Sequence, residues 1–316
     1  MSSGRPDFAV NPFNGPAPTF EQVVASGFRR SIGSQLINAD AQVPYSHQAN
    51  AGIQRQISPT MAVEADYTYN GERHWMISRP NWNLRYDPVT GANYPITDIA
   101  NLPYPDWGLV NRTLTEGWGN YHALSTGFTK RMSHRWQASA TYLLSAFRDA
   151  GSSPVSDHDR SLNFEIARDL YDYYALAATD QRHRAVFNGI WDVGYGFQLS
   201  GLYFFGSGYR FATTYGDDAR RTGATGGRLR PDGSIVPRTN FVGDPLHRID
   251  MRVQRRFSFG GRMGVDGIVE IFNVFNHDNF GSYTTVESNA RYGEPTSNTG
   301  IAYQPRMVQL GFRFTF

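Results

Sequence analysis

The sequence predicts an all-β chain whose strands run antiparallel in up-and-down order. Three observations predict this class. Apolar and polar residues alternate with a period of two in one segment after another. The connections between these segments are alternately very short and very long. No apolar run approaches the ~18–20 residues of a membrane-spanning helix, and no segment has a convincing long helical pattern.

The clearest strand is the last one. Gln309, Gly311, Arg313 and Thr315 occupy its polar face. Its apolar face holds Val308, Leu310, Phe312, Phe314 and Phe316. The same period recurs in eight other segments: 43–57, 62–70, 120–131, 136–145, 183–193, 197–205, 249–256 and 263–271. We therefore expect about nine strands, and we expect 161–178, the best helical candidate, to be a loop with one or two turns.

Tight turns join these strands in pairs. They are expected at Ser58-Pro59-Thr60, Ser133-His134, Gly194-Tyr195-Gly196 and Gly260-Gly261. Between the pairs lie long connections at about 73–117, 148–181, 207–246 and 277–303. Structureless loops of this length are unusual in a compact soluble domain. Short periplasmic turns that alternate with long extracellular loops are typical of transmembrane β-barrels.

Composition narrows the function classes. The 316 residues include 30 Lys+Arg and 28 Asp+Glu, so the net charge of +2 argues against a charge-driven nucleic-acid binder. The absence of cysteine excludes disulfides, thiolate metal sites and cysteine nucleophiles. Aromatic residues make up 14% of the chain, which argues against disorder. The mean hydropathy of −0.47 is compatible with a transmembrane barrel, because alternating strands average out as polar.

The aromatic residues cluster near strand ends, as the girdles at both membrane interfaces require. This set comprises Trp75, Trp118, Trp136, Trp191, Tyr195, Phe197, Phe257, Phe259 and Phe275. The alternative is a soluble β-sandwich whose aromatic residues fill a core. Four loops of about 27 to 45 residues and a near absence of lysine at strand edges (Lys130 is the only lysine) favour the barrel.

Four stretches carry a resemblance to a known family. They are Tyr121-His122-Ala123-Leu124 with the following strands, Asp180-Gln181-Arg182-His183-Arg184, the segment Glu270 to Gly281 (EIFNVFNHDNFG), and the end of the chain from Pro305 to Phe316. In this order they resemble the C-terminal part of a TonB-dependent outer-membrane receptor of the Oar-like, acidobacterial type. The resemblance covers about residues 5 to 316.

The resemblance implies a 22-stranded barrel, filled by a plug domain and powered from the inner membrane through TonB. The chain holds about nine strands, no recognisable plug or TonB box, and no signal peptide in its first residues. We therefore expect a loop segment at 1–42 and a partial barrel at 43–316, belonging to a longer receptor of the outer membrane. In that reading the plug and the TonB complex are partners only through the missing N-terminal part.

Two sets of residues are candidate functional sites. The resemblance implies that the last strand, through Val308, Leu310, Phe312, Phe314 and Phe316, is the signal read by the barrel-assembly machinery. By parity, nine charged residues share the polar faces and would line the lumen: Glu64, Asp66, Asp192, Asp250, Arg252, Arg256, Asp266, Glu270 and Arg313. Because both signs occur at nearby positions, ion pairs within the wall are expected rather than a selective ring.

The loops offer a weaker site for an external ligand. Aromatic residues of the first loop could stack on a sugar, siderophore or peptide, although packing within the loop explains them as well: Trp75, Trp82, Tyr86, Tyr94, Tyr104 and Trp107. Arg220, Arg221, Arg228 and Arg230 make a later loop basic, which suits an anionic ligand or simply a solvated surface.

The sequence shows no enzyme motif. Asp157-His158-Asp159, and His183 near Asp180, have metal-ligand types without a recognised spacing, so no metal or cofactor is expected. The leading function is uptake of an unidentified scarce solute by the full receptor, with outer-membrane lipid as a further partner. The alternatives are an outer-membrane adhesion or structural barrel and a soluble β-rich ligand-binding protein.

Overall fold

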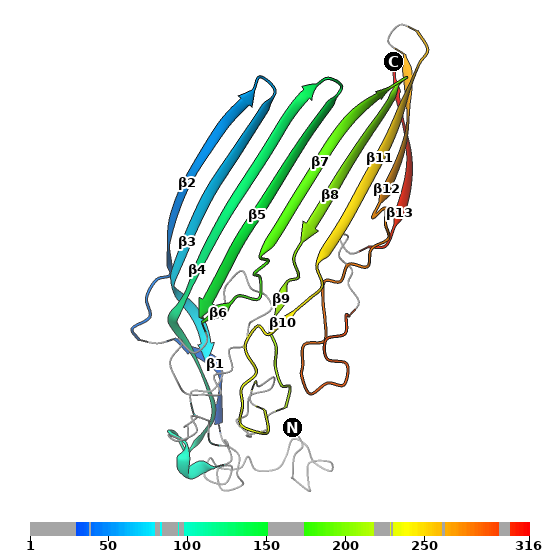
Figure 1. The fold of residues 1–316 in the computed structure, drawn as a ribbon. Helices are drawn as coiled ribbons and strands as arrows, with labels where there is room; N and C mark the ends of the chain where they lie inside the picture. Colours follow the sequence, from blue (N-terminus) through cyan, green and yellow to red (C-terminus); the bar gives the residue numbers. More distant parts are fainter. Residues whose placement is uncertain are drawn as a thin grey trace.

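A computed structural model describes residues 30–37, 39–79, 83, 94, 98–150, 174–217, 228, 230–260, 263–296 and 304–316. Nine long strands form one antiparallel path in sequence order (Figure 1). They are β2 (Tyr45–Ser58), β3 (Met61–Arg79), β4 (Trp107–Ser133), β5 (Trp136–Ala150), β7 (His183–Gly194), β8 (Phe197–Gly206), β11 (Leu246–Ser258), β12 (Gly264–Phe272) and β13 (Met307–Thr315). The nine strands expected from the sequence are confirmed.

Shorter elements lie at the loop end of the sheet. β1 (Arg30–Ile37) pairs with β4 in parallel, and β6 (Ala175–Leu176) pairs with β5. β9 (Arg210–Phe211) and β10 (Phe241–Val242) form a separate two-stranded ribbon. A 3-10 turn spans Ile99–Asn101. The described residues include no helix long and apolar enough to cross a bilayer.

Two predicted boundaries were wrong. The expected loop 73–117 is shortened at both ends, because β3 and β4 keep pairing through bulges as far as Arg79 and Arg112. β4 has 27 residues, far more than the ~9–11 that span a bilayer, so its first part stands beyond the membrane. Of the segment 161–178, residues 161–173 lie outside the described chain, and Ala175–Leu176 is the short strand β6.

Where the structure describes them, the tight turns lie at one end of the sheet and the long connections at the other (Figure 1). The predicted turn at Gly260-Gly261 is described only as far as Gly260. His134 and Arg135 have φ values of 51° and 72°, so both central residues of the β4–β5 turn are left-handed, as a type I′ hairpin requires. Tyr195 and Gly196 have φ values of 53° and 79° between β7 and β8. Such turns match the right-handed twist of the strands that they join.

One face of the sheet is apolar and exposed. Ile53 on β2, Phe187 on β7 and Leu310 on β13 are 71%, 50% and 76% exposed. The fully buried side chains lie instead near the loop end, where Ala150 and Val236 are 0% exposed. A soluble monomer rarely exposes more than ~300–600 Å² of contiguous apolar surface. A face that is apolar across the whole sheet therefore suits lipid rather than water.

The sheet has two unpaired edges within the described residues. β2 pairs only with β3, and β13 pairs only with β12. Each edge leaves a row of backbone N–H and C=O groups without strand partners, and such groups cannot face lipid unsatisfied. The nine strands therefore make part of a barrel wall rather than a closed barrel.

Candidate functional site

The sheet register places the nine charged residues predicted from parity on one face, opposite the apolar face. On β11, Arg252 stands level with Glu270 of β12, and Arg256 stands level with Asp266. Asp266 in turn stands level with Arg313 of β13. Following the cross-strand partners from β11 back to β3 carries this face to Asp192, Asp66 and Glu64. One polar surface thus crosses the whole sheet.

Opposite charges pair on this polar face. Arg248 Nε donates to Asp250 Oδ1 and Oδ2 at 2.9 and 3.0 Å. The backbone N–H of Asn273 also donates to Asp250 Oδ1, at 2.8 Å. Arg252 lies 3.8 Å from Glu270 and donates to Gln254 Oε1 at 3.0 Å. Pairs within the wall therefore account for much of the charge near β11 and β12.

Asp266 is the exception on this face. It is only 3% exposed, and its Oδ1 has no hydrogen-bond partner among the described residues. Leaving a buried acceptor unsatisfied costs about 1–3 kcal/mol. Its register neighbours Arg256 and Arg313 carry the opposite charge.

Two glycines make room for carboxylates at the other edge of the sheet. A Cβ on Gly52 would collide with the Asp66 carboxylate, and one on Gly127 would collide with the Glu64 carboxylate. Asp66 and Glu64 therefore lie flat across neighbouring strands instead of projecting from the wall. This packing could not be read from the sequence, because it depends on which strand each carboxylate meets.

The last strand presents the predicted apolar row. Val308, Leu310, Phe312 and Phe314 are 63–76% exposed on the apolar face of β13, and Phe316 follows the strand end at 99% exposed. The rings of Phe312 and Phe314 meet edge to face at 5.4 Å. The row is accessible to an external protein along the free edge of the sheet.

Several predicted loop residues are committed to the fold. Trp75 is 5% exposed and packs edge-on against Phe147 at 6.1 Å. Arg230 forms a bidentate pair with Glu287 at 2.7 and 2.9 Å, and this hydrogen bond raises the Arg230 pKa. Arg228 donates to Val236 O at 3.1 Å, and Trp107 begins β4.

The other predicted loop residues are more accessible or are not described. Tyr104 is 47% exposed, and Tyr94 is half-buried. Seven further residues singled out from the sequence lie outside the described part of the chain: Trp82, Tyr86, Asp157, His158, Asp159, Arg220 and Arg221.

Sequence reasoning missed two structural features of the loop end. Asn83 is fully buried. Its Nδ2 donates to the carbonyls of Tyr104, Trp107 and Gly108 at 2.8–3.0 Å, while its Oδ1 accepts from the Tyr104 N–H at 2.8 Å. The Asn83 side chain thus binds residues 104–108, where β4 begins, through four hydrogen bonds. No local pattern around Asn83 signals this role.

The second missed feature is a buried ion pair. Arg238 Nη2 donates to Asp149 Oδ1, and the two side chains are 3% and 2% exposed. Burial lowers the pKa of Arg238 to about 10. Nearby, Asp180 accepts from the Phe147 N–H at 2.8 Å and lies 3.9 Å from Arg210. These contacts join the connection after β5 to the connection after β8.

The described residues hold no group of three or more His, Cys, Asp or Glu side chains placed to bind a metal ion. Asp180, which the sequence offered as a possible metal ligand, accepts a hydrogen bond from the Phe147 N–H and forms an ion pair with Arg210. The chemistry of the described surface is that of a charged wall on one face and an apolar wall on the other.

Comparison with known proteins decides the family. A family described as "Outer membrane beta barrel domain" matches residues 2–236 and 233–309, which is nearly the whole chain. The chain belongs to this family.

Solved structures of low sequence identity are also similar to the chain. The outer-membrane transporter YddB from Escherichia coli is 13% identical with a TM-score of 0.49, and the match covers 91% of this chain and 35% of YddB. The FrpB iron transporter from Neisseria meningitidis is 12% identical, with a TM-score of 0.48 and coverages of 90% and 33%. A mutant ferric enterobactin receptor, PfeA, from Pseudomonas aeruginosa is 10% identical, with a TM-score of 0.49 and coverages of 86% and 31%. The chain spans about a third of each of these proteins. A comparison with curated protein sequences finds no match.

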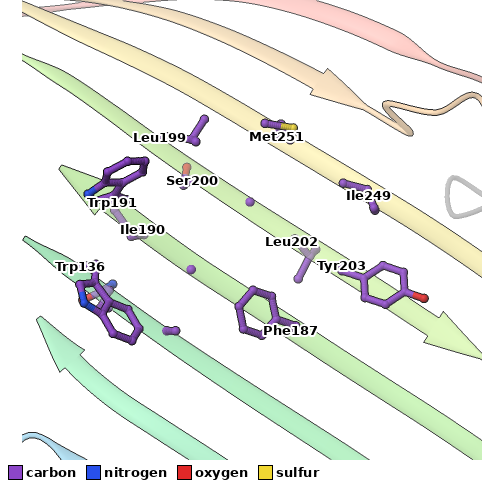
Figure 2. A pocket seen from close by; sticks show the side chains of 14 residues that line it. Trp136, Phe187, Ile190, Trp191, Leu199, Ser200, Leu202, Tyr203, Ile249 and Met251 are labelled. Carbon is purple, nitrogen blue, oxygen red and sulfur yellow. The ribbon is translucent and has the colours of Figure 1, made fainter. Parts of the chain in front are cut away.

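As an outer-membrane barrel domain, the chain lies in the outer membrane with its apolar face toward lipid. A hollow of about 660 Å³ interrupts that face, with Ala138, Gly189 and Gly201 among the residues that line it. Figure 2 shows Trp136 and Trp191 near one end of it and Tyr203 toward the other. The three small residues stand side by side on neighbouring strands, so the hollow arises where the wall carries almost no side-chain bulk.

Proposed function

We propose that this chain forms the C-terminal part of the barrel of a TonB-dependent outer-membrane receptor, which takes up a scarce solute. The observation that carries the proposal is the division of the sheet into an apolar face and a charged face, with both edges left to pair. In a closed barrel of this family the charged face lines the interior. There Glu64, Asp66, Asp192, Asp250, Arg252, Arg256, Asp266, Glu270 and Arg313 would meet a plug or a solute.

The last strand would serve assembly. Its exposed row of alternating apolar residues, ending in Phe316, is accessible along a free sheet edge. In this proposal the barrel-assembly machinery recognises Val308, Leu310, Phe312, Phe314 and Phe316. The plug and the TonB complex would act through other parts of the receptor.

The loop end would form the outer surface of the receptor. Phe211, Phe241 and Tyr283 pack with ring centroids 5.0–6.1 Å apart, and Arg230 joins Glu287 across two loops. These contacts between loops stabilise one loop conformation, as a ligand-binding surface requires. It suits an adhesion protein equally well, and the experiment must separate the two.

The test measures solute uptake in the source organism with and without the gene. Labelled ferric siderophore, cobalamin, oligosaccharide and peptide are supplied at limiting concentrations, with and without a protonophore. We expect loss of the gene to abolish uptake of one solute, and the protonophore to do the same in the wild type. Unchanged uptake of all four solutes, together with loss of surface attachment, would replace this function by adhesion.

A paired variant tests the lumen assignment. Arg252→Glu places a like charge beside Glu270 on the polar face, whereas Val253→Glu places a charge on the adjacent residue, which lies on the lipid face. We expect the first variant to reach the membrane with altered uptake. The second should lower the membrane level instead, because a charge on the lipid face impairs insertion. The opposite pattern would reverse the two faces.

A further inference from the structure

Three tyrosine–histidine pairs repeat on the apolar face near the loop end. The hydroxyl of Tyr67 lies 2.7 Å from His122 Nδ1. Tyr142 and His183 meet in the same way at 2.8 Å, and Tyr203 and His247 at 3.0 Å. Their ring centroids are 6.3, 6.2 and 6.3 Å apart. Each pair joins the two strands that flank one long connection.

The pairs have the same place in the register. Tyr67 stands opposite Leu124, two residues from His122. Tyr142 stands opposite Ala185, two residues from His183, and Tyr203 stands opposite Ile249, two residues from His247. The repeated diagonal shows that the three contacts are one structural motif used three times.

The histidines follow a constant step across the sheet. Tracing cross-strand partners from His183 through β5 to β4 arrives at Leu124, two residues from His122. The same tracing from His247 through β8 to β7 arrives at Ala185, two residues from His183. Tracing backward from His122 through β3 to β2 arrives two residues from His47. Extending the register past β12 places Arg306, just before β13, at the fifth position. We call these five residues the loop-end row.

This step places the loop-end row parallel to the membrane. The step of two residues over two strands is a shift of one residue per strand. With a rise of ~3.3 Å per residue and a strand spacing of ~4.8 Å, this shift inclines the row by about 35° to the perpendicular of the strands. Strands of transmembrane barrels tilt by about 35–45° from the axis. The row therefore runs at nearly constant height around the barrel.

A second row fixes the height within the bilayer. Eight positions after each histidine of the row, on the same face, stands a cation or a tryptophan: Arg55, Lys130, Trp191 and Arg255. Eight residues of strand at this tilt span about 22 Å along the barrel axis, close to the ~25 Å apolar band of outer-membrane barrels. The residues between the rows on this face are uncharged. The histidines thus lie at the headgroup level on the loop side, where amphipathic rings are favoured.

Each pair keeps a hydrogen-bond donor for the surroundings. If the tyrosine donates to Nδ1, the histidine carries its proton on Nε2; if Nδ1 donates, the phenol O–H is left over. No described residue hydrogen-bonds Nε2 of His122, His183 or His247. An unsatisfied donor costs about 1–3 kcal/mol away from water, so an acceptor at this level stabilises each pair. Arg306, exposed at the fifth position, selects an anionic acceptor.

We propose that the loop-end row, His47, His122, His183, His247 and Arg306, binds the phosphate groups of lipids in the outer leaflet. The tyrosines position three of the imidazoles, and the row fixes the height and rotation of the barrel in the bilayer. This inference rests on the family and the register, and it holds whichever solute the receptor carries.

The test uses the full gene product purified from outer membranes in a mild detergent. The triple variant His122→Phe, His183→Phe and His247→Phe keeps the rings and removes the nitrogen donors. Loss of one ordinary hydrogen bond weakens binding about 2- to 10-fold, so we expect the triple variant to retain less than half of the protein-bound phosphorus. His134→Asn removes an imidazole from the turn at the opposite end, where Asn suits the left-handed backbone; this variant is the control and should retain all of it.

A second set of variants guards against misfolding. Tyr67→Phe, Tyr142→Phe and Tyr203→Phe remove only the hydroxyl groups, and heat-modifiable migration on gels reports whether the barrel has formed. In nanodiscs, the wild type should bind phosphatidylglycerol more tightly than monogalactosyl diglyceride, which lacks phosphate, and the triple histidine variant should lose that preference. Equal phosphorus in a folded triple variant, or equal binding of both lipids by the wild type, would overturn the proposal.

Discussion

The buried pair between Asp149 and Arg238 gives the sharpest prediction about stability. Burial lowers the pKa of Arg238 to about 10 from its ordinary value of 12.5, which corresponds to about 3 kcal/mol against the buried cation. Asp149 supplies the opposite charge at hydrogen-bond contact. Asp149→Asn keeps the shape but removes the carboxylate charge that Arg238 contacts.

Removing one partner of a buried pair costs about 3–5 kcal/mol. The cost should fall on the loop end, because Arg238 lies in the connection after β8, with its carbonyl accepting from the Thr213 N–H at 3.0 Å. The neighbouring Thr239 Oγ1 donates to Leu176 O at 2.6 Å. We therefore expect this region to open about 10²- to 10⁴-fold more often in Asp149→Asn, while the barrel strands stay protected.

Hydrogen exchange followed by mass spectrometry measures this directly on peptides covering 174–182 and 230–242. A double variant, Asp149→Leu with Arg238→Met, replaces both charges by apolar groups and should recover most of the protection. Arg230→Met, which breaks a more exposed pair with Glu287, is the control and should change exchange only slightly. If Asp149→Asn exchanges within about twofold of the wild type, or if the double variant is no better than the single, the reasoning fails.

Three further predictions follow from the structure. Deleting Phe316, or changing it to Asp, should lower the amount of heat-modifiable protein in outer-membrane fractions, whereas Thr315→Ser should not; equal amounts would refute the assembly signal. Asn83→Ala removes four hydrogen bonds made by a fully buried side chain. This variant should raise the rate of proteolysis within 98–107 about tenfold or more, and cleavage at the wild-type rate would contradict this prediction. Lys130, 3% exposed and donating to the carbonyls of Ser133 and Trp136 at 2.9 Å, should resist amine-reactive reagents until the barrel is unfolded; rapid labelling of Lys130 in the native protein would contradict this.

The period of two was sufficient to predict the strands and the face of each side chain. Val308 to Phe316 could be assigned to one face without any partner strand, because side-chain direction alternates along a single chain. For the same reason the nine charged residues could be placed together by parity. The loop boundaries were predicted less well, since β3 and β4 continue through bulges that no local signal marks.

Tertiary structure alone decided which residues meet across strands. Asp149 and Arg238 are 89 positions apart, and Tyr67 and His122 are 55 apart; nothing near either residue identifies the other. The row formed by His47, His122, His183 and His247 exists only once the register is known. A strand's own sequence determines its faces, but the shift of each strand against its neighbour depends on loop length, turn geometry and packing over the whole sheet. That shift determines which side chains share one height in the membrane.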